Sequence, residues 1–371
     1  MSSTVIAHTI APRLVLRGTE VWPEALDAIA RLGRRPLLLG RGDATSPLRR
    51  DLLTQLQGAG LAVQAAELRH DCCEEDLQRL REDAAGGPEA SRDLIVAMGG
   101  GKVLDAGKLL AHRLDLPCVT VPTSAATCAG WTALSNLYTP AGAFLGDVSL
   151  ARCPDLLVFD HALVRQAPTR TLVSGSADAM AKWYEASVSS AQSADGLVQQ
   201  AVQQARLLRD QMLLDGEAAL AASTSEAWVR VAEGAALTAG LIGGLGGARC
   251  RTVAAHAVHN GLTQLPATHQ HLHGEKVGFG ILVQLRLEEL LGGNRLAGQA
   301  RQQLLTFFRA LGVPCDLADL GLLQASLSDL LAVCEHACLN GYDLHHLPFA
   351  VTPHDLLGAL VHTTCPAVPM G

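Results

Sequence analysis

The sequence predicts an α/β domain with a mostly parallel sheet, followed by an all-helical domain. From about residue 12 to 160, short apolar runs alternate with helical patterns, as in a sheet whose strands are joined by covering helices. After about Pro168 the strand signals fade, and long periods rich in Ala, Leu, Gln and Glu take over. A chain of 371 residues is also long enough for two cores. We therefore expect domains at 1–165 and 166–371.

The elements expected in the first half alternate regularly. Strands are predicted at 14–16, 36–39, 61–65 and 94–98, and helices at 22–31, 47–59 and 74–83. In the second half, long helices are predicted at 186–214 and 225–241. A Gly-rich stretch at 240–247 and a loop at 266–273 interrupt the helical pattern there.

Composition and charge exclude several classes of protein. With 49% hydrophobic and 18% charged residues, the chain has the make-up of a globular protein rather than a disordered one. The net charge is −7 and no basic stripe is present, so nucleic acid is not expected as a partner. We expect no membrane span, and residues 1–18 lack the pattern of a signal peptide. The 10 cysteines are irregularly spaced, which favours reduced thiols and a cytoplasmic location.

A triple-Gly turn marks a candidate nucleotide site in the first domain. The apolar run 94–98 leads into Gly99-Gly100-Gly101 and then into a helical pattern. Glycines let the main chain approach a pyrophosphate, and the free amides at the start of a helix attract its charge. One helix later, the segment 119–128 places hydroxyls, Thr123 among them, at the end of another strand. Because ligands bind at the carboxyl ends of parallel strands, we expect both segments to line one site.

Three short segments of the second domain hold a candidate metal site. They supply one carboxylate and two imidazoles, Asp178, His256 and His273, which is a suitable ligand set for a divalent metal with an open position. His259 lies three residues after His256, so both share one face of a helix. His259 is therefore the candidate catalytic residue, either in proton relay or in contact with the nicotinamide. The alternative is that it supports the metal ligands from outside without reacting itself.

The chain resembles the group III metal-dependent alcohol dehydrogenases, the iron-containing type, in five segments that occur in order: G-G-G-K-V-L-D-A-G-K, V-P-T-S-A-A-T-C-A-G-W-T-A-L-S, G-S-A-D-A-M-A-K-W-Y-E-A, A-A-H-A-V-H-N-G-L and H-G-E-K-V. Within that family it is similar to the glycerol dehydrogenase branch, and most similar to bacterial hydroxycarboxylate dehydrogenases. The resemblance covers roughly residues 12 to 360. It implies a dehydroquinate synthase-like fold, homo-oligomers, and a cleft between the domains that holds coenzyme, metal and substrate.

The resemblance also implies roles for individual residues. It assigns the metal to Asp178, His256 and His273. The residues implied to contact the coenzyme are Gly100, Gly101 and Lys102 at the pyrophosphate turn, and Thr123, Thr132, Leu134 and Tyr138 beyond it.

The chain departs from the family pattern at the metal and substrate positions. Iron-dependent members have a histidine ligand one helical turn after the metal aspartate, where this chain has Lys182. Zinc with three protein ligands is therefore favoured over iron. Glycerol dehydrogenases place an aspartate where this chain has Cys128, three residues before the bulky Trp131. Because a thiol does not replace a carboxylate as acceptor for a polyol, glycerol is disfavoured as the substrate.

A third departure concerns the coenzyme. NAD-dependent members carry an aspartate after the first coenzyme strand, where it accepts hydrogen bonds from the adenosine ribose. Here the sequence reads Leu38-Leu39-Gly40-Arg41. An Arg binds a phosphate, so NADP(H) is favoured over NAD(H). The alternative interpretation is that Arg41 is a solvated surface residue.

Two cations near the metal motifs suggest an anionic substrate. Lys182 and Arg251 are suited to binding the carboxylate of a 2-oxo acid. Either could instead belong to a structural ion pair, since Glu185 lies one helical turn after Lys182.

These observations favour a metal-dependent oxidoreductase that transfers a hydride between NAD(P)(H) and a small substrate, reducing 2-oxo acids to 2-hydroxy acids. One alternative is an NAD-dependent glycerol or polyol dehydrogenase. An alternative from another class is a sugar-phosphate cyclase of the dehydroquinate synthase type, whose metal site uses a glutamate where this chain has Asp178.

Overall fold

The computed structural model describes residues 7–86, 91–190, 192–247, 250–339 and 343–368. The chain divides into two compact units, 1–167 and 168–371. The boundary expected from the sequence lies two residues earlier, after residue 165.

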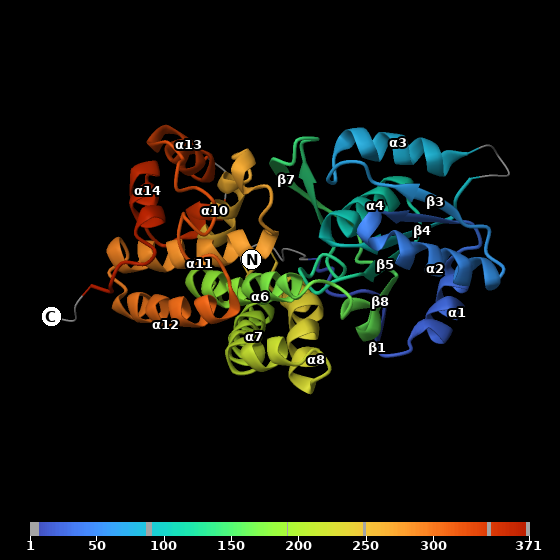
Figure 1. The fold of residues 1–371 in the computed structure, drawn as a ribbon, viewed down its shortest axis with the longest axis horizontal. Helices are drawn as coiled ribbons and strands as arrows, with labels where there is room; N and C mark the ends of the chain where they lie inside the picture. Colours follow the sequence, from blue (N-terminus) through green and yellow to red (C-terminus); the bar gives the residue numbers. More distant parts are fainter. Residues whose placement is uncertain (1–6, 87–90, 191, 248–249, 340–342, 369–371) are drawn as a thin grey trace, which may run out of the picture. The chain divides into compact units, whose positions relative to one another are not determined.

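The first unit is built on a six-stranded parallel sheet (Figure 1). Its strands, in spatial order, are β1 (Leu14–Gly18), β8 (Leu156–Asp160), β5 (Cys118–Pro122), β4 (Leu94–Gly99), β2 (Pro36–Gly40) and β3 (Gln64–Glu67). All neighbouring pairs in this sheet are parallel, which confirms the predicted fold class. A separate antiparallel pair, β6 (Leu134–Tyr138) and β7 (Phe144–Ser149), follows β5. This pair was not predicted from the sequence. The two strands are short and lack a continuous apolar run, and they mix buried, half-buried and exposed positions.

Helices cover both faces of the parallel sheet because alternate strand residues point to opposite sides. Leu37, Leu39 and Ala97 pack in one core with α3 (Glu74–Ala85) and α4 (Gly101–Leu114). Leu38 and Val96 pack in the other core with α1 (Trp22–Leu32) and α2 (Ser46–Gly58). Short helical turns occupy Asp43–Thr45 and His161–Val164 (α5).

The described part of the second unit is helical, as the sequence predicts. Its longer elements are α6 (Thr169–Ser189), α7 (Gly196–Ala221), α8 (Glu226–Glu233), α9 (Ala239–Gly246), α10 (Ala254–Leu262), α11 (His273–Leu290), α12 (Arg295–Leu311), α13 (Leu327–Ala337) and α14 (Pro353–Val361). A π-helical segment, Gly234–Thr238, joins α8 to α9, and short 3-10 turns lie at Pro266–Thr268 and Asp343–His346. Helix α11 is buried along almost its whole length, from Gly274 to Glu289, and α6, α10, α12 and α14 pack against it.

The single helix predicted over 186–214 is wrong. Helix α6 ends at Ser189, and α7 begins at Gly196. The carboxylate of Asp195 accepts hydrogen bonds from the N–H groups of Leu197 and Val198, which caps the start of α7. The break therefore follows from a capping residue within a Ser-rich stretch, a local signal that can end a helical period.

Close packing of α4 on β4 gives a test of the fold. A Cβ atom at Gly107 would collide with the Cβ of Ala97, whereas one at Gly58, the last residue of α2, would meet nothing within 4 Å. We expect Gly107→Ala to destabilise the protein by about 1–3 kcal/mol through overpacking. We expect Gly58→Ala to be neutral or to stabilise it by up to about 1 kcal/mol. Melting temperatures of the two variants measure the difference, and equal shifts would contradict the packing described.

Candidate functional site

Asp178, His256 and His273 come together in the second unit. Asp178 lies in α6, His256 in α10, and His273 is the first residue of α11. One ligand atom from each lies within 4.8 Å of the others. The Nε2 atoms of His256 and His273 are 3.4 and 3.5 Å from Oδ1 of Asp178. We call these three side chains the Asp–His–His cluster.

The donor atoms of this cluster fit a divalent metal. Oδ1 of Asp178 is buried and has no hydrogen-bond partner. A buried anionic oxygen without a partner is costly unless a positive group compensates it. One carboxylate oxygen and two imidazole nitrogens that converge on a common point are a typical ligand set for zinc with an open position.

Glu185 orients the first imidazole. Its buried carboxylate lies on α6, two helical turns after Asp178, and its Oε2 is 2.6 Å from Nδ1 of His256. Because a carboxylate only accepts hydrogen bonds, Nδ1 of His256 carries the proton. The lone pair of Nε2 is then directed at the cluster, in the arrangement by which outer carboxylates orient metal-binding histidines.

His259 orients the second imidazole. Nδ1 of His259 lies 2.9 Å from Oδ1 of Asn260, and Nε2 of His259 lies 2.9 Å from Nδ1 of His273. With Oδ1 of Asn260 as the final acceptor, both Nδ1 atoms donate, and Nε2 of His273 keeps its lone pair for the cluster. His259 thus shares a helix with His256, as the spacing predicts, and lies directly behind His273. Its predicted catalytic role stays a prediction.

Glu185 also holds the start of α10. This helix begins without a capping side chain of its own. Oε1 of Glu185 accepts from the N–H groups of Val253 and His256, at 2.6 and 3.0 Å. Oε1 of Gln284, on α11, accepts from the two N–H groups between them. The first-turn amides of α10 are therefore satisfied by α6 and α11, the helices that carry the other two members of the cluster.

A buried cation lies beside the cluster. Lys182 is 5% exposed and one helical turn after Asp178, and its Nζ donates to the main-chain carbonyl of Arg251 at 3.4 Å. Burial raises the pKa of Asp178, but Lys182 and the two histidines outweigh that effect and hold the pKa well below its usual range. Burial lowers the pKa of His256, but Glu185 and Asp178 outweigh it and raise the pKa to about 9, so a metal at Nε2 would take the place of a proton there. The carboxylate is therefore ionised and available as a ligand.

The structure brings the predicted cations to this region in different ways. Lys182 reaches the cluster through its charge. Arg251 contacts Lys182 through its main-chain carbonyl. Its side chain packs against Gly243, where a Cβ atom would lie within 3.4 Å of Cγ and Cδ of Arg251.

Glu185 faces α10 and holds His256, a role that was not predicted from the sequence. Its spacing of seven residues from Asp178 was the available signal, since it places both on one face of a helix.

The Gly turn lies in the first unit at the carboxyl end of β4. Gly100 precedes α4, and Gly101 is its first residue. A Cβ at Gly101 would lie 2.7 Å from Cγ2 of Thr127, and the N–H of Thr123 donates to the carbonyl of Gly99 at 3.1 Å. The turn and the segment after β5 therefore lie together at the edge where ligands bind in parallel sheets.

The other residues predicted to contact the coenzyme lie on α4 or contact it; they are Lys102, Thr132, Leu134 and Tyr138. Lys108 is buried, and its Nζ donates to the carbonyl and hydroxyl oxygens of Thr132, at 3.1 and 3.2 Å, and to the carbonyl of Leu134. Nζ of Lys102 lies over the ring of Tyr138, 4.8 Å from its centroid. Thr132 and Leu134 thus anchor the β6 segment to α4. Their coenzyme contacts stay predictions.

Arg41, Cys128 and Trp131 also lie in the first unit. Arg41 follows β2 and forms an ion pair with Asp71 at 2.5 Å. The carbonyl of Cys128 accepts from the N–H of Trp131 at 2.9 Å, and the indole N–H donates to the carbonyl of Ile10 at 3.0 Å. Cys128 and Trp131 are therefore parts of one ordered turn, and their substrate roles stay predictions.

A second group of possible metal ligands has a structural explanation. Among the described residues, His70, Cys73 and Asp76 also place donor atoms within 4.8 Å of one another. The carboxylate of Asp76 already accepts from the N–H groups of Arg69 and His70 and pairs with Arg79 at 2.8 Å. It holds the turn at the start of α3, and we assign no metal to it.

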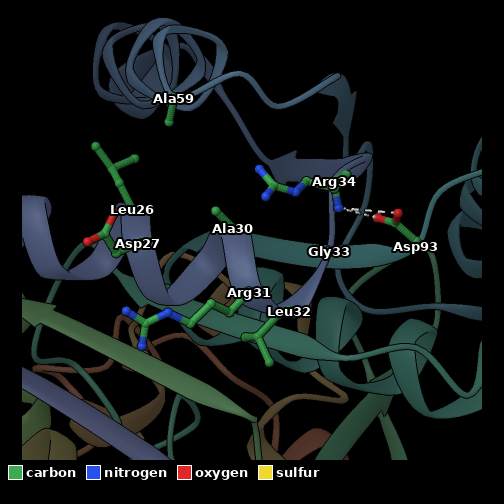
Figure 2. A pocket seen from close by; sticks show the side chains of 9 residues that line it. All are labelled: Leu26, Asp27, Ala30, Arg31, Leu32, Gly33, Arg34, Ala59 and Asp93. Carbon is green, nitrogen blue, oxygen red and sulfur yellow. Dashed lines mark hydrogen bonds between the residues drawn. The ribbon is translucent and has the colours of Figure 1, made fainter.

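The first unit has a cavity of about 780 Å³, whose lining residues are drawn in Figure 2. Figure 2 shows the main-chain N–H of Arg34 donating to Asp93, residues that come before β2 and β4. The cavity therefore lies at the amino ends of these strands, and none of the predicted site residues lines it. Its lining residues are Leu26, Asp27, Ala30, Arg31, Leu32, Gly33, Arg34, Ala59 and Asp93.

Comparison with known proteins gives a consistent result. Residues 12–161 match the family model of the iron-containing alcohol dehydrogenases. An oxidoreductase of Synechocystis is 50% identical over 98% of this chain and 93% of its own length. Hydroxycarboxylate dehydrogenase A of Escherichia coli is 35% identical over 78% of this chain and 79% of its own length. The crystal structure of a probable glycerol dehydrogenase from Sinorhizobium meliloti has a TM-score of 0.83 at 29% identity, covering 96% of this chain and 97% of that one.

In the part of the chain that the structure describes, none of the helices combines the length and the apolar character needed to span a membrane.

The role of Glu185 predicts that Glu185→Gln weakens metal binding about 10- to 100-fold. If the amide oxygen keeps its place at the N–H groups of α10, the amide nitrogen faces Nδ1 of His256. Because both are donors, the imidazole must move its proton to Nε2 and lose the lone pair that faces the cluster. Zinc affinity, measured by competition with a chromophoric chelator, tests this result.

The matched control is Glu226→Gln, which removes the same charge from an exposed position on α8. A zinc affinity of Glu185→Gln within twofold of the control would contradict the orienting role. Circular dichroism of both variants separates this effect from a loss of helix α10.

Proposed function

This chain belongs to the iron-containing alcohol dehydrogenase family, and from that premise we propose that it reduces 2-oxo acids to 2-hydroxy acids. It is a metal-dependent oxidoreductase that acts on alcohol groups and uses a nicotinamide coenzyme. Family membership places it among oxidoreductases, so the sugar-phosphate cyclase alternative is not carried further.

Lys182 is the observation that carries the choice of substrate. Its ammonium group is buried, and within the described part of the chain it forms no ion pair. The carbonyl of Arg251, at 3.4 Å, is a distant acceptor for a group with three N–H donors. The charge of Lys182 also acts on Asp178, but a bound metal would engage that carboxylate; a substrate carboxylate would then compensate the buried ammonium group, whereas a neutral polyol would not.

The Asp–His–His cluster is the second observation that supports the proposed function, because its side chains suit a bound metal. We propose that Asp178, His256 and His273 hold zinc through Oδ1 and the two Nε2 atoms, because Lys182 stands where a fourth ligand would be needed for iron. A bound zinc ion would polarise the substrate C–O bond, and the coenzyme carries the hydride. Glu185 and His259 keep the two imidazoles in the tautomer that metal binding requires. Lys182 would bind the carboxylate of the substrate and so orient it. His259 is the candidate for relaying a proton.

The coenzyme is assigned to the Gly turn of the first unit. A Cβ at Gly100 would meet nothing within 4 Å, so this residue leaves the start of α4 open to a pyrophosphate, and Lys102 lies in the first turn of the helix. The preference for NADP(H), predicted from Arg41, stays a prediction. Arg41 already forms an ion pair with Asp71.

The second candidate function is a glycerol or other polyol dehydrogenase. The similarity to the probable glycerol dehydrogenase of Sinorhizobium meliloti favours it. Cys128, which stands where the family places an aspartate for polyol hydroxyls, speaks against it. Assembly into homo-oligomers and a cytoplasmic location stay predictions.

Replacing the buried cation should distinguish the two substrates. We expect Lys182→Met to raise KM for 2-oxobutanoate about 10- to 100-fold, because a charge-assisted hydrogen bond to the carboxylate is lost. The KM for dihydroxyacetone, which has no carboxylate, should stay within about threefold. Steady-state kinetics with both substrates, on enzyme of equal zinc content, provides the measurement.

Two outcomes would favour the polyol dehydrogenase instead. One is an equal change of KM for both substrates. The other is a wild-type enzyme that turns over glycerol with NAD but neither 2-oxobutanoate nor 2-oxoglutarate.

Removing the metal should abolish turnover. After dialysis against a chelator we expect loss of activity and recovery on addition of zinc, since the cluster supplies all three protein ligands. His273→Ala should bind no zinc at stoichiometric concentration and stay inactive, while NADH still binds at the Gly turn. Metal analysis and NADH fluorescence titration check the two parts separately. Full activity of the chelated enzyme would refute the metal assignment.

A further inference from the structure

Asp71 connects two cations next to the Gly turn. Its Oδ1 lies 2.5 Å from a guanidinium nitrogen of Arg41, and its Oδ2 is hydrogen-bonded to Nζ of Lys102. The Asp71 side chain is 9% exposed, while those of Arg41 and Lys102 are 38% and 45% exposed. A buried carboxylate thus holds two cations that both face solvent.

The cluster lies at the carboxyl ends of three neighbouring strands. Arg41 follows β2, Lys102 is in the first turn of the helix after β4, and Asp71 lies beyond β3. Strand β2 lies between β4 and β3, so the Gly turn, Arg41 and Asp71 succeed one another along this edge. In such folds a dinucleotide extends from the pyrophosphate turn toward the neighbouring strand, where an acidic residue or an Arg meets the adenosine ribose.

The main chain around Asp71 is held on both sides. The N–H of Leu68 donates to the carbonyl of Gly40 at 2.8 Å, and the N–H of Tyr138 donates to the carbonyl of Cys72 at 2.9 Å. The loop therefore connects the end of β2 with β6, and Asp71 has little freedom to withdraw. Its carboxylate is therefore held at this edge. Burial raises its pKa, but Lys102 and Arg41 outweigh that effect and lower the pKa.

This arrangement changes what Arg41 can bind. A ribose 2′-phosphate approaching the guanidinium would meet the carboxylate of Asp71 at hydrogen-bond distance. The phosphate must either displace Asp71, which leaves a buried charge without its partner, or accept repulsion from it. A free 2′-hydroxyl meets neither obstacle and can donate a hydrogen bond to a carboxylate.

We propose that Asp71 selects NAD(H) over NADP(H) by holding Arg41 and Lys102 in an ion-pair cluster. The inference rests on the proposed function, because it assumes that a nicotinamide dinucleotide binds at the Gly turn. It makes Asp71 the residue that determines coenzyme specificity, and it reverses the preference that Arg41 alone predicts.

The test is a double-mutant cycle of wild type, Asp71→Asn, Arg41→Met and the double variant, all zinc-loaded. Dissociation constants of NADH and NADPH are measured by fluorescence titration. Competition with 5′-ADP and 2′,5′-ADP isolates the contribution of the 2′-phosphate without the nicotinamide. These readouts do not depend on turnover.

We expect wild type to bind NADH more tightly than NADPH. Asp71→Asn should lower the ratio of the NADPH to the NADH dissociation constant about tenfold, because the released guanidinium can bind the phosphate. The double variant should return the ratio close to the wild-type value. The competitor 2′,5′-ADP should follow the same pattern relative to 5′-ADP.

The matched control is Asp115→Asn. Asp115 pairs with Arg152 at 3.1 Å at the other end of α4, about 20 Å from the Gly turn along the helix. Its backbone is left-handed, with φ of 50°, which Asn tolerates. The control removes the same charge from the same unit and should leave the ratio unchanged, whereas a merely structural effect of Asp71→Asn would weaken both coenzymes equally.

Three results would overturn the inference. The ratio could stay unchanged in Asp71→Asn, the gain could persist in the double variant, or wild type could already bind NADPH more tightly through Arg41. A wild-type protein that binds neither NADH nor NADPH would overturn the proposed function itself, and is distinguishable from these results.

Discussion

The hydrogen-bonded carboxylate of Glu185 is the interaction on which the Asp–His–His cluster depends. One oxygen closes the first turn of α10, and the other fixes the proton on His256. A buried carboxylate costs free energy unless hydrogen bonds replace its hydration, and here three donors of α10 do so. The start of the helix and the direction of the His256 imidazole are therefore set by the same side chain.

Helix α11 completes this arrangement from the other side. Gln284 satisfies the two amides of α10 that Glu185 does not reach, and His273 stands at the helix start. Since α11 is buried along most of its length, its position is fixed by the packing of the whole unit. The Asp–His–His cluster is thus built into the core, where the surrounding packing holds its side chains in place.

Buried carboxylates also determine how the cations of this chain act. Asp71 engages Arg41 and Lys102 at the Gly turn, whereas Lys182 lies beside the metal cluster with a distant carbonyl as its acceptor. A cation that already forms an ion pair adds less attraction for a ligand anion than one that does not. The two groups of cations therefore differ in what they offer to an anionic ligand.

Local patterns in the sequence determined the alternation of strands and helices in the first unit, the Gly turn after β4, and the residue types suited to a metal. These depend on periodicity and on short motifs, which act over a few neighbouring residues. The break between α6 and α7 was also local, through Asp195, although the helical period concealed it. Only the tertiary structure decided that Glu185 faces His256 and that Asp71 faces Arg41. The partners are 71 and 30 residues apart, so strand order and helix packing, rather than local sequence, bring them together.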